Sequence, residues 1–189
     1  MVNPFSFDSI PIEGLIITNY FVATDNRGFY AKSYSEKIFK ELGFNVIIKE
    51  ISHITSHKGV VRGLHFQREN PQAKMFRCVC GRIFAVAVDL RKGSETIGKW
   101  FGVELSPENR KGFLVPKGFA AGNISLEENS VLVYESTENY YPEFDMGIAW
   151  DDPDVGIEWP LGQISSVILS DKDKNSMSYR EFIQQYGGV

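Results

Sequence analysis

The sequence predicts a mainly β protein with a few short helices, built as a β-sandwich or a barrel. Short segments rich in β-branched and aromatic residues recur along the chain, and turn-forming Gly, Pro, Asn and Asp residues separate them at short intervals. Strands do not alternate with long helical segments, as they would in a parallel α/β fold. Many closely spaced strands are typical of sandwiches and barrels.

The N-terminal elements follow from these patterns. A strand at 15–24 ends at the turn-forming residues 25–28, and extended structure resumes at 29–33. Residues 33–36 fit a capping box for a short helix, which carries apolar residues at helical spacing and ends at Gly43.

Further strands are expected through the middle of the chain, at residues 45–54, 76–80, 83–90, 100–105, 113–115, 119–125 and 131–135. The region 140–159 holds several prolines, glycines and aspartates, so we expect it to be rich in loops. Residues 179–186 are expected to form a short closing helix.

One segment, residues 59–74, holds several side chains that could carry chemistry. Its valines predict a strand, and side chains alternate between the two faces of a strand. Gly63, His65 and Gln67 would then share one face. Arg62 would point to the opposite face, together with apolar neighbours.

A hairpin over residues 68–71 would bring the next strand back beside this one. Lys74 would then lie near His65, with the Arg62 guanidinium in the same neighbourhood. An imidazole, an ammonium group and a guanidinium group brought close together suit an anionic substrate that must lose a proton. The residues alone support this functional hypothesis.

The bulk composition is that of a soluble globular protein. Of the 189 residues, 43% are hydrophobic and 23% are charged, and we expect a single domain over residues 1–189. The formal net charge is −4 and the basic residues are scattered, so nucleic acid is not expected as a partner.

The sequence has no feature of a membrane or secreted protein. The longest purely apolar run, at 83–88, is far shorter than the roughly 20 residues that a spanning helix needs. Residues 1–15 lack the basic start and apolar block of a secretory signal. Cys78 and Cys80 share one face of a predicted strand, where they cannot easily bridge, so we expect free thiols and a cytoplasmic location.

The sequence resembles the dTDP-4-dehydrorhamnose 3,5-epimerases through motifs that run in one order along nearly the whole chain. These motifs are DNRGFY (25–30), GVVRGLHFQ (59–67), QAKMFRCVCGRIFAVAVDLRKGSETIG (72–98), LSPENRKGFLVPKGFA (105–120), WDDPDVGIEWP (150–160) and LSDKD (169–173). The resemblance implies a cupin-type jelly roll, also called a double-stranded β-helix, and a homodimer formed through exchanged strands. It also implies a nucleotide-sugar substrate and no cofactor.

The family inverts the carbons that flank the 4-keto group of a nucleotide-linked 6-deoxysugar. The resemblance therefore implies a 3,5-epimerase of the type that converts dTDP-4-dehydro-6-deoxyglucose to dTDP-4-dehydrorhamnose. A hydrogen beside a ketone is only weakly acidic, so the reaction needs a base and a group that stabilises the enolate oxygen. It also needs an acid on the opposite face of the sugar, because returning the proton to the same face changes nothing.

Four residues match these catalytic roles. His65 matches the base, since an imidazole can accept a proton at physiological pH, and Asp173 matches the carboxylate that orients it. Asp171 is a competitor for that second role. Tyr134 matches the proton donor, and Lys74 matches the residue near the developing oxyanion. Without the resemblance, a structural histidine, a turn aspartate, a cross-strand tyrosine and a solvated lysine would be the simpler interpretations.

Six further positions match substrate contacts of the family. Arg27 and Arg62 match contacts to phosphate or sugar, where a planar guanidinium suits an oxyanion. Tyr140 matches the aromatic residue that stacks on the nucleobase. The expected substrate-binding set is completed by Gln67, Asp145 and Lys172.

The chain departs from the family at several of its site positions. The family's GFAHGF segment reads GFAAGN here, and Ala121 replaces the histidine beside the keto oxygen, so more of the enolate stabilisation would fall on Lys74. Lys32 replaces a glutamate, and Glu50 and Ser52 stand where the family has a glutamine and an asparagine that contact the nucleotide. The nucleotide (dTDP, CDP, UDP or GDP) and the number of inverted centres, one or two, therefore stay open.

Three other functions also stay open. They are a C3-only epimerase of a different nucleotide 4-keto sugar, a non-catalytic cupin that binds sugar nucleotides, and a ketoisomerase of 4-keto sugars. A bound transition metal is not expected, because metal-binding cupins use an HxH pair and a later histidine. This chain has three histidines, no HxH pair, and Ala121 where the last ligand would fall.

Overall fold

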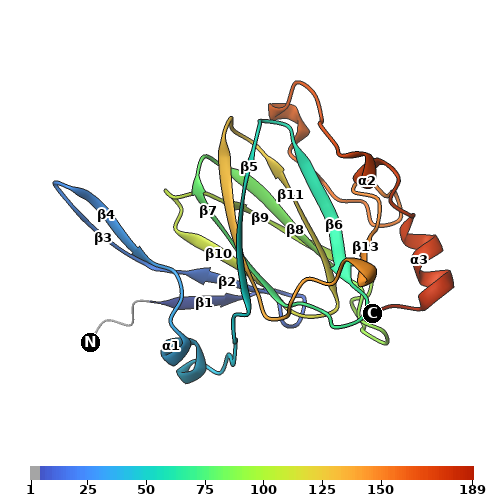
Figure 1. Cartoon of the computed structure of the whole chain (residues 1–189), viewed down its shortest axis with the longest axis horizontal. Coiled ribbons are helices and arrows are strands. Elements are labelled where there is room, and N and C mark those ends of the chain that lie inside the picture. The colour runs from blue at the N-terminus through green and yellow to red at the C-terminus, as the bar shows by residue number, and fades with distance from the viewer. Residues whose placement is uncertain (1–4) are drawn as a thin grey trace.

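The computed structural model describes residues 5–189, and two β-sheets make up most of it (Figure 1). The larger sheet has the strand order β1, β2, β10, β7, β12, β5, with the bounds Ser6–Ser9, Ile16–Asn19, Lys111–Val115, Lys74–Cys80, Ser130–Ser136 and Glu50–Ser56. The smaller sheet has the order β13, β6, β11, β8, β9, with the bounds Asp145–Gly147, Val61–Gln67, Phe119–Ser125, Ile83–Asp89 and Trp100–Leu105. This architecture confirms the mainly β prediction.

The remaining elements lie around the two sheets. A separate hairpin of β3 (Phe21–Asp25) and β4 (Gly28–Lys32) projects away from the body of the molecule (Figure 1). The helical elements are α1 (Glu36–Glu41), η1 (Pro142–Phe144), η2 (Leu161–Gln163), α2 (Asp171–Lys174) and α3 (Tyr179–Tyr186). Within residues 5–189, no helix has the length and apolar character that a membrane span requires. Residues 1–15 are expected to lack a secretory signal, and the first four of them lie outside the described residues.

The hydrophobic core lies between the two sheets. Phe76 and Phe113 enter it from the larger sheet, and Ile83 and Leu105 enter it from the smaller one. Their burial follows from strand alternation, which sends every second side chain of each strand inwards. The outer face of the smaller sheet is covered by α3, whose Phe182 ring packs edge-on against Phe66 of β6 at 5.1 Å between ring centroids.

Two predictions about the central segment are wrong. The first is the hairpin, because β6 belongs to the smaller sheet and β7 to the larger one. Each strand has an inward apolar face to bury, and placing them in opposite sheets buries both faces in one core. Lys74 and His65 still come together, but across the interior of the sandwich rather than along one ladder.

The second wrong prediction put Arg62 and His65 on opposite faces. The pairing of β6 with β11 shifts register, so that His65 lies opposite Ala121 while Arg62 lies opposite Asn123. β6 therefore carries one extra residue in this interval, which reverses the alternation of its side chains. Gly63 fits this close approach with φ of +117°, since a Cβ atom there would lie 2.6 Å from the Cα of Gly122.

The N-terminal predictions are correct in type and wrong in detail. The expected strand at 15–24 divides at Tyr20, whose backbone amide donates to the carbonyl of Arg110, and its second half leaves the sheet as β3. The capping box at 33–36 does not form: the N-cap of α1 is Ser35, with no side-chain hydrogen bond. Ser33 instead accepts a hydrogen bond from Arg77.

The other mid-chain strands begin and end within two residues of their predicted bounds, but the strand expected at 45–54 begins only at Glu50 and ends at Ser56. A short strand, β13, forms inside the predicted loop-rich region. The closing helix spans Tyr179–Tyr186 as predicted, with a capping box of its own at Ser178 and Glu181. The two cysteines are free thiols, as expected.

Candidate active site

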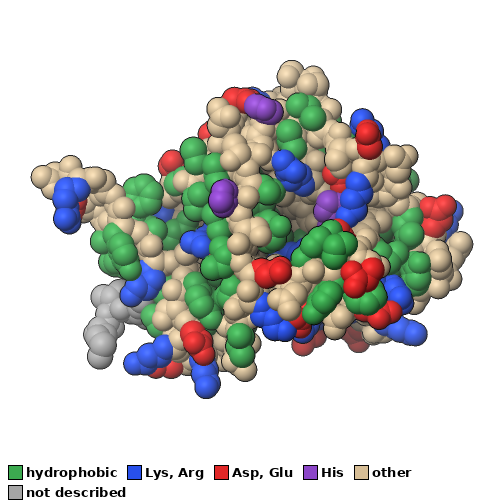
Figure 2. All heavy atoms as spheres, in the orientation of Figure 1, with side chains coloured by type: hydrophobic (Ala, Val, Ile, Leu, Met, Phe, Trp, Pro, Cys, Tyr) green, Lys and Arg blue, Asp and Glu red, His purple; other side chains and the backbone are tan. Residues whose placement is uncertain are grey.

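A cavity opens between β5 of the larger sheet and β6 of the smaller one, and Figure 2 shows this face hollowed, with basic and histidine side chains inside. Its outer compartment has a volume of about 640 Å³ and is lined by Glu50, Ile51, Ser52, His65, Gln72, Lys74, Tyr134, Ser136, Tyr140, Asp145 and Lys172. Its inner compartment has a volume of about 260 Å³ and is lined by Ile54, Arg62, His65, Lys74, Phe76, Ala121, Gly122, Asn123, Leu132, Tyr134, Ser170 and Asp173.

Three side chains line both compartments: His65, Lys74 and Tyr134. They come from three different strands, β6, β7 and β12, and so from both sheets. The sequence predicted all three as catalytic residues, and the structure brings them together. A group that passes from one compartment to the other meets each of them.

His65 is held by a carboxylate of the C-terminal region. Its Nε2 lies 2.6 Å from Oδ1 of Asp173, and the other oxygen of that carboxylate accepts a hydrogen bond from the Ser170 hydroxyl at 2.7 Å. The backbone explains the placement, because Val60 bridges Ile168 in parallel and draws the C-terminal chain along the start of β6. Asp171 does not compete for this contact, since it lies exposed and pairs with Lys174.

The environment keeps Asp173 ionised. Its side chain is only 4% exposed, and this burial alone would favour the neutral acid. Hydrogen bonds from His65, from Ser170 and from the backbone amide of Gly63 outweigh that effect and hold the pKa of Asp173 below its ordinary value. A buried anion that accepts from Nε2 leaves Nδ1 of the imidazole as the nitrogen free to take a proton.

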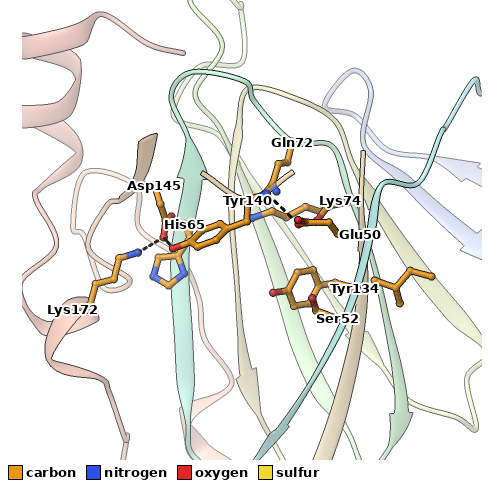
Figure 3. A pocket seen from close by; sticks show the side chains of 11 residues that line it. Glu50, Ser52, His65, Gln72, Lys74, Tyr134, Tyr140, Asp145 and Lys172 are labelled. Carbon is orange, nitrogen blue, oxygen red and sulfur yellow. Dashed lines mark hydrogen bonds and ion pairs between the residues drawn. The ribbon is translucent and has the colours of Figure 1, made fainter. Parts of the chain in front are cut away.

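Tyr134 faces His65 from the opposite sheet. Its ring packs against Phe76 at 6.1 Å between ring centroids, and Figure 3 shows its hydroxyl pointing to the side of the cavity from which His65 projects. Within residues 5–189, no hydrogen bond engages this hydroxyl. The imidazole and the phenol therefore approach one space from two sides, as the proton transfer predicted from the sequence requires.

Lys74 reaches the same space from β7. Burial lowers the pKa of its ammonium group, the nearby carboxylate of Asp145 raises it, and the charge of Lys172 lowers it. In the described part of the chain, no ion pair or hydrogen bond engages the Lys74 ammonium group. A desolvated cation without a protein partner is suited to bind an oxygen on which negative charge develops.

A polar cluster at the mouth contains three of the predicted substrate-binding residues. The hydroxyl of Tyr140 donates to Asp145 at 2.7 Å, and Lys172 donates to the same carboxylate oxygen at 2.5 Å (Figure 3). The hydrogen bond to Asp145, with burial second, raises the pKa of Tyr140 to about 12. About half of the Tyr140 residue is exposed, so its ring is open to stacking.

The other three predicted substrate-binding residues are placed differently. Arg62 lines the inner compartment, with Nε donating to Ser56 at 3.1 Å. Gln67 does not line either compartment: its amide donates to the carbonyls of Asn70 and Asn139 and accepts from the amide of Tyr141. It thereby fixes the loop that carries Tyr140.

Arg27 lies at the turn of the projecting β3–β4 hairpin, outside both compartments. Its guanidinium pairs with Asp25 at 2.6 Å, and its side chain is 85% exposed. Within one chain, therefore, Arg27 is not brought to the cavity.

Sequence reasoning did not assign a role to several lining residues. Ser170 and Asn123 are the clearest cases, because a lone serine in a turn and a lone asparagine in a strand are ordinary residues without a motif. The only signal was the departure of Asn123 from the family segment that also contains Ala121. In the described part of the chain, no group of three or more His, Cys, Asp or Glu side chains could hold a metal ion.

The chain is similar to known proteins over nearly its whole length. The model of the dTDP-4-dehydrorhamnose 3,5-epimerase family matches residues 9–181. The dTDP-4-dehydrorhamnose 3,5-epimerase of Methanothermobacter thermautotrophicus is 48% identical over 177 residues, which are 94% of this chain and 96% of the relative.

Solved structures show the same fold. The crystal structure of dTDP-6-deoxy-D-glucose-3,5-epimerase from Legionella pneumophila, in complex with dTDP-4-keto-L-rhamnose, is 38% identical, covers 92% of each chain and has a TM-score of 0.89. A 3′-monoepimerase from Streptomyces bikiniensis, in complex with dTDP-quinovose, is 30% identical, covers 94% of this chain and 89% of its own and has a TM-score of 0.85. The fold is therefore the expected cupin-type jelly roll, and the chain belongs to the dTDP-4-dehydrorhamnose 3,5-epimerase family.

Proposed function

We propose that the chain is a cofactor-independent 3,5-epimerase of a nucleotide-linked 4-keto-6-deoxysugar, of the type that converts dTDP-4-dehydro-6-deoxyglucose to dTDP-4-dehydrorhamnose. The observation that carries this proposal is the placement of His65, paired with Asp173, and Tyr134 on opposite sides of one cavity. An epimerisation needs a base and an acid on opposite faces of the same carbon. The relatives named above act on or bind dTDP-linked sugars, which favours dTDP as the nucleotide.

The first step breaks the C–H bond at C3 or C5. The proton passes to Nδ1 of His65, and the electron pair of the bond moves towards the C4 carbonyl, which becomes an enolate. Asp173 stabilises the imidazolium that forms, because its buried carboxylate already accepts from Nε2. Lys74 stabilises the enolate oxygen, since its ammonium group lines the same space without a protein partner.

The second step returns a proton to the opposite face of the carbon. The Tyr134 hydroxyl donates it, the enolate collapses to the ketone and the configuration is inverted. The phenolate of Tyr134 and the imidazolium of His65 then return to their starting states by proton exchange with solvent. The sugar must present its second centre to the same pair of residues for C5 to be inverted as well.

The mouth of the cavity supplies the nucleotide contacts. The exposed ring of Tyr140 offers a stacking surface, and its hydrogen bond to Asp145 fixes its orientation. Lys172 supplies positive charge for the diphosphate at the mouth, and Arg62 adds positive charge from the inner compartment.

A homodimer would complete the site through Arg27. The β3–β4 hairpin projects from the body and exposes large apolar side chains, with Phe29 at 63% and Tyr30 at 57%. Such a hairpin gains stability by packing on a second copy, and its turn would carry Arg27 to the partner's cavity. We place the protein in the cytoplasm, where free cysteines persist and nucleotide sugars are made.

The test of the reaction is solvent deuterium exchange. The protein is incubated in deuterated water with dTDP-, CDP-, UDP- and GDP-linked 4-keto-6-deoxyglucose, and NMR locates the label in the product. Label at both C3 and C5 of the dTDP sugar supports the proposal. Label at C3 alone supports the C3-only epimerase, the alternative suggested by Ala121, which replaces the family's histidine. Binding without any exchange supports the non-catalytic cupin, and a 3-keto product supports the ketoisomerase.

The test of the dimer is complementation between two variants. Arg27→Ala and His65→Asn proteins are each expected to be weakly active or inactive. A heterodimer would hold one site with both changes and one site with neither, so co-expression should restore about a quarter of wild-type activity. If the mixture stays as inactive as its parts, while sedimentation shows that mixed dimers have formed, Arg27 does not act across the interface.

A further inference from the structure

Asn123 of β11 is a buried polar residue that the proposed mechanism does not use. It lines the inner compartment and is only 6% exposed. Within residues 5–189, its side-chain amide takes part in no hydrogen bond. The amide atoms are not among the fully buried polar atoms that lack a partner, so they keep access to the cavity, where they can bind water or substrate.

The strand pairing places the Asn123 amide in the same compartment as His65. Asn123 lies opposite Arg62 in the ladder with β6, and Ala121 lies opposite His65. Residues directly opposite each other in an antiparallel pair point to the same face, so Asn123 and Arg62 enter the compartment together. The register shift at Gly63 is what brings this pair and His65 onto one face.

The described neighbours of Asn123 do not hydrogen-bond its amide, and the Arg62 guanidinium donates instead to Ser56 and to the carbonyl of Thr55. Its register partner on β8 is Ala85, and the larger sheet lines this compartment with the apolar side chains of Ile54, Phe76 and Leu132 and the polar ones of Lys74 and Tyr134. The apolar side chains offer no hydrogen-bonding group, and within residues 5–189 neither Lys74 nor Tyr134 hydrogen-bonds the amide. The N–H groups and the carbonyl oxygen of the Asn123 side chain are therefore free to bind a molecule in the cavity.

The wall that β11 contributes to the compartment has a single polar side chain. It consists of Ala121, Gly122 and Asn123, so any substrate oxygen facing this wall meets a methyl group, backbone or this amide. A hexose ring carries oxygens on most of its carbons, and a buried oxygen without a donor would bind poorly. An amide donates two hydrogens and accepts at its oxygen, which suits hydroxyl and carbonyl groups alike.

We propose that Asn123 is a substrate-contacting, specificity-determining residue, whose side-chain amide hydrogen-bonds an oxygen of the hexose that faces β11. This inference rests on the proposed function and names a further residue of that site. It assigns to Asn123 the polar contact on β11 that Ala121 cannot make. Substrates with an oxygen at that place are favoured, and analogues without it lose the advantage.

The experiment compares Asn123→Leu with the wild type. Leucine has nearly the same shape, but it offers no hydrogen bond, so the variant should fold at least as stably and raise or keep the melting temperature. Deuterium exchange into dTDP-4-keto-6-deoxyglucose should fall about 10- to 100-fold in kcat/KM, as expected for a lost hydrogen bond to substrate. Asn123→Ala serves in the same way if the leucine variant does not fold.

Thr18→Val is the matched control. Thr18 is fully buried on β2, its hydroxyl has no partner, and it lines neither compartment. Removing that hydroxyl should leave exchange unchanged, which separates loss of a substrate contact from the general effect of removing a buried polar group. If wild type exchanges and Asn123→Leu exchanges within twofold of it, the inference is wrong. If wild type itself exchanges no proton on any 4-keto sugar, the proposed function fails instead.

Discussion

Replacing Asp173 with Asn tests how much His65 depends on its buried partner. The carboxylate lies 2.6 Å from Nε2 of His65, and its other oxygen is held by Ser170. Asparagine keeps the shape of the side chain but removes the negative charge, and its NH₂ group can face the imidazole. The imidazolium that forms during catalysis would then lose its counter-charge, and Nδ1 would no longer be the favoured basic nitrogen.

The structure sets the expected size of the effect. A separation of 2.6 Å is short for a hydrogen bond between an imidazole and a carboxylate, and the carboxylate is only 4% exposed, so solvent cannot replace it. We expect the rate of proton exchange to fall between about 10²- and 10⁴-fold, which corresponds to about 3–5 kcal/mol of transition-state stabilisation. Exchange should be measured at saturating substrate, so that the loss is assigned to the chemical step.

The same change should alter the response to acid. The pKa of Asp173 is lowered in the folded protein, so its ionised form adds stability above the ordinary carboxyl range, and that stability is lost as the pH falls towards the lowered value. Asp173→Asn lacks this contribution and should lose less stability than wild type between about pH 5 and pH 3. Asp171→Asn is the control, because Asp171 is exposed and pairs only with Lys174. Retention of wild-type exchange within threefold by Asp173→Asn would refute the reasoning.

Two further predictions follow from the charges and thiols of the larger sheet. Lys74→Met keeps the apolar stem of the side chain and removes the ammonium group, so proton exchange should fall about a hundredfold or more. The fold should be no less stable, because burial disfavours the charge of Lys74. A loss of exchange of less than tenfold would contradict the assigned role. Cys78 is buried, with its pKa raised to about 11, whereas Cys80 is exposed. An alkylating reagent at pH 8 should therefore label Cys80 alone in the native protein and both thiols after unfolding. Mass spectrometry of the native sample would contradict this if it found Cys78 labelled as fast as Cys80.

Local patterns predicted the elements well, because neighbouring residues determine them. The strands at Trp100–Leu105 and Phe119–Ser125 and the helix at Tyr179–Tyr186 have the predicted bounds. Each is enclosed by turn or capping residues whose preferences act over a few positions. The strand at 15–24 failed in detail because a contact with Arg110, far along the chain, decides where it divides.

The arrangement of the site depended on non-local pairing, which no local pattern contains. His65 and Lys74 are close in sequence, yet they meet across two sheets. Arg62 joins His65 on one face only because β6 shifts register against β11. The roles of His65, Asp173, Tyr134 and Lys74 were suggested by family resemblance, and the structure adds the cavity that brings them together. The sequence marked Asn123 only as a departure from the family segment, and the structure shows that its amide lines the inner compartment without a hydrogen bond to the described part of the protein.

The central claim is that His65 removes the proton from one face of the sugar carbon and Tyr134 returns one to the other. The most direct measurement is NMR of dTDP-4-keto-6-deoxyglucose after incubation in deuterated water with Tyr134→Phe or with His65→Asn. We predict that Tyr134→Phe incorporates deuterium at C3 with retained configuration, because the base still works and the opposing acid is missing, whereas His65→Asn incorporates none. Inversion at a near wild-type rate by Tyr134→Phe, or exchange by His65→Asn, would contradict the account.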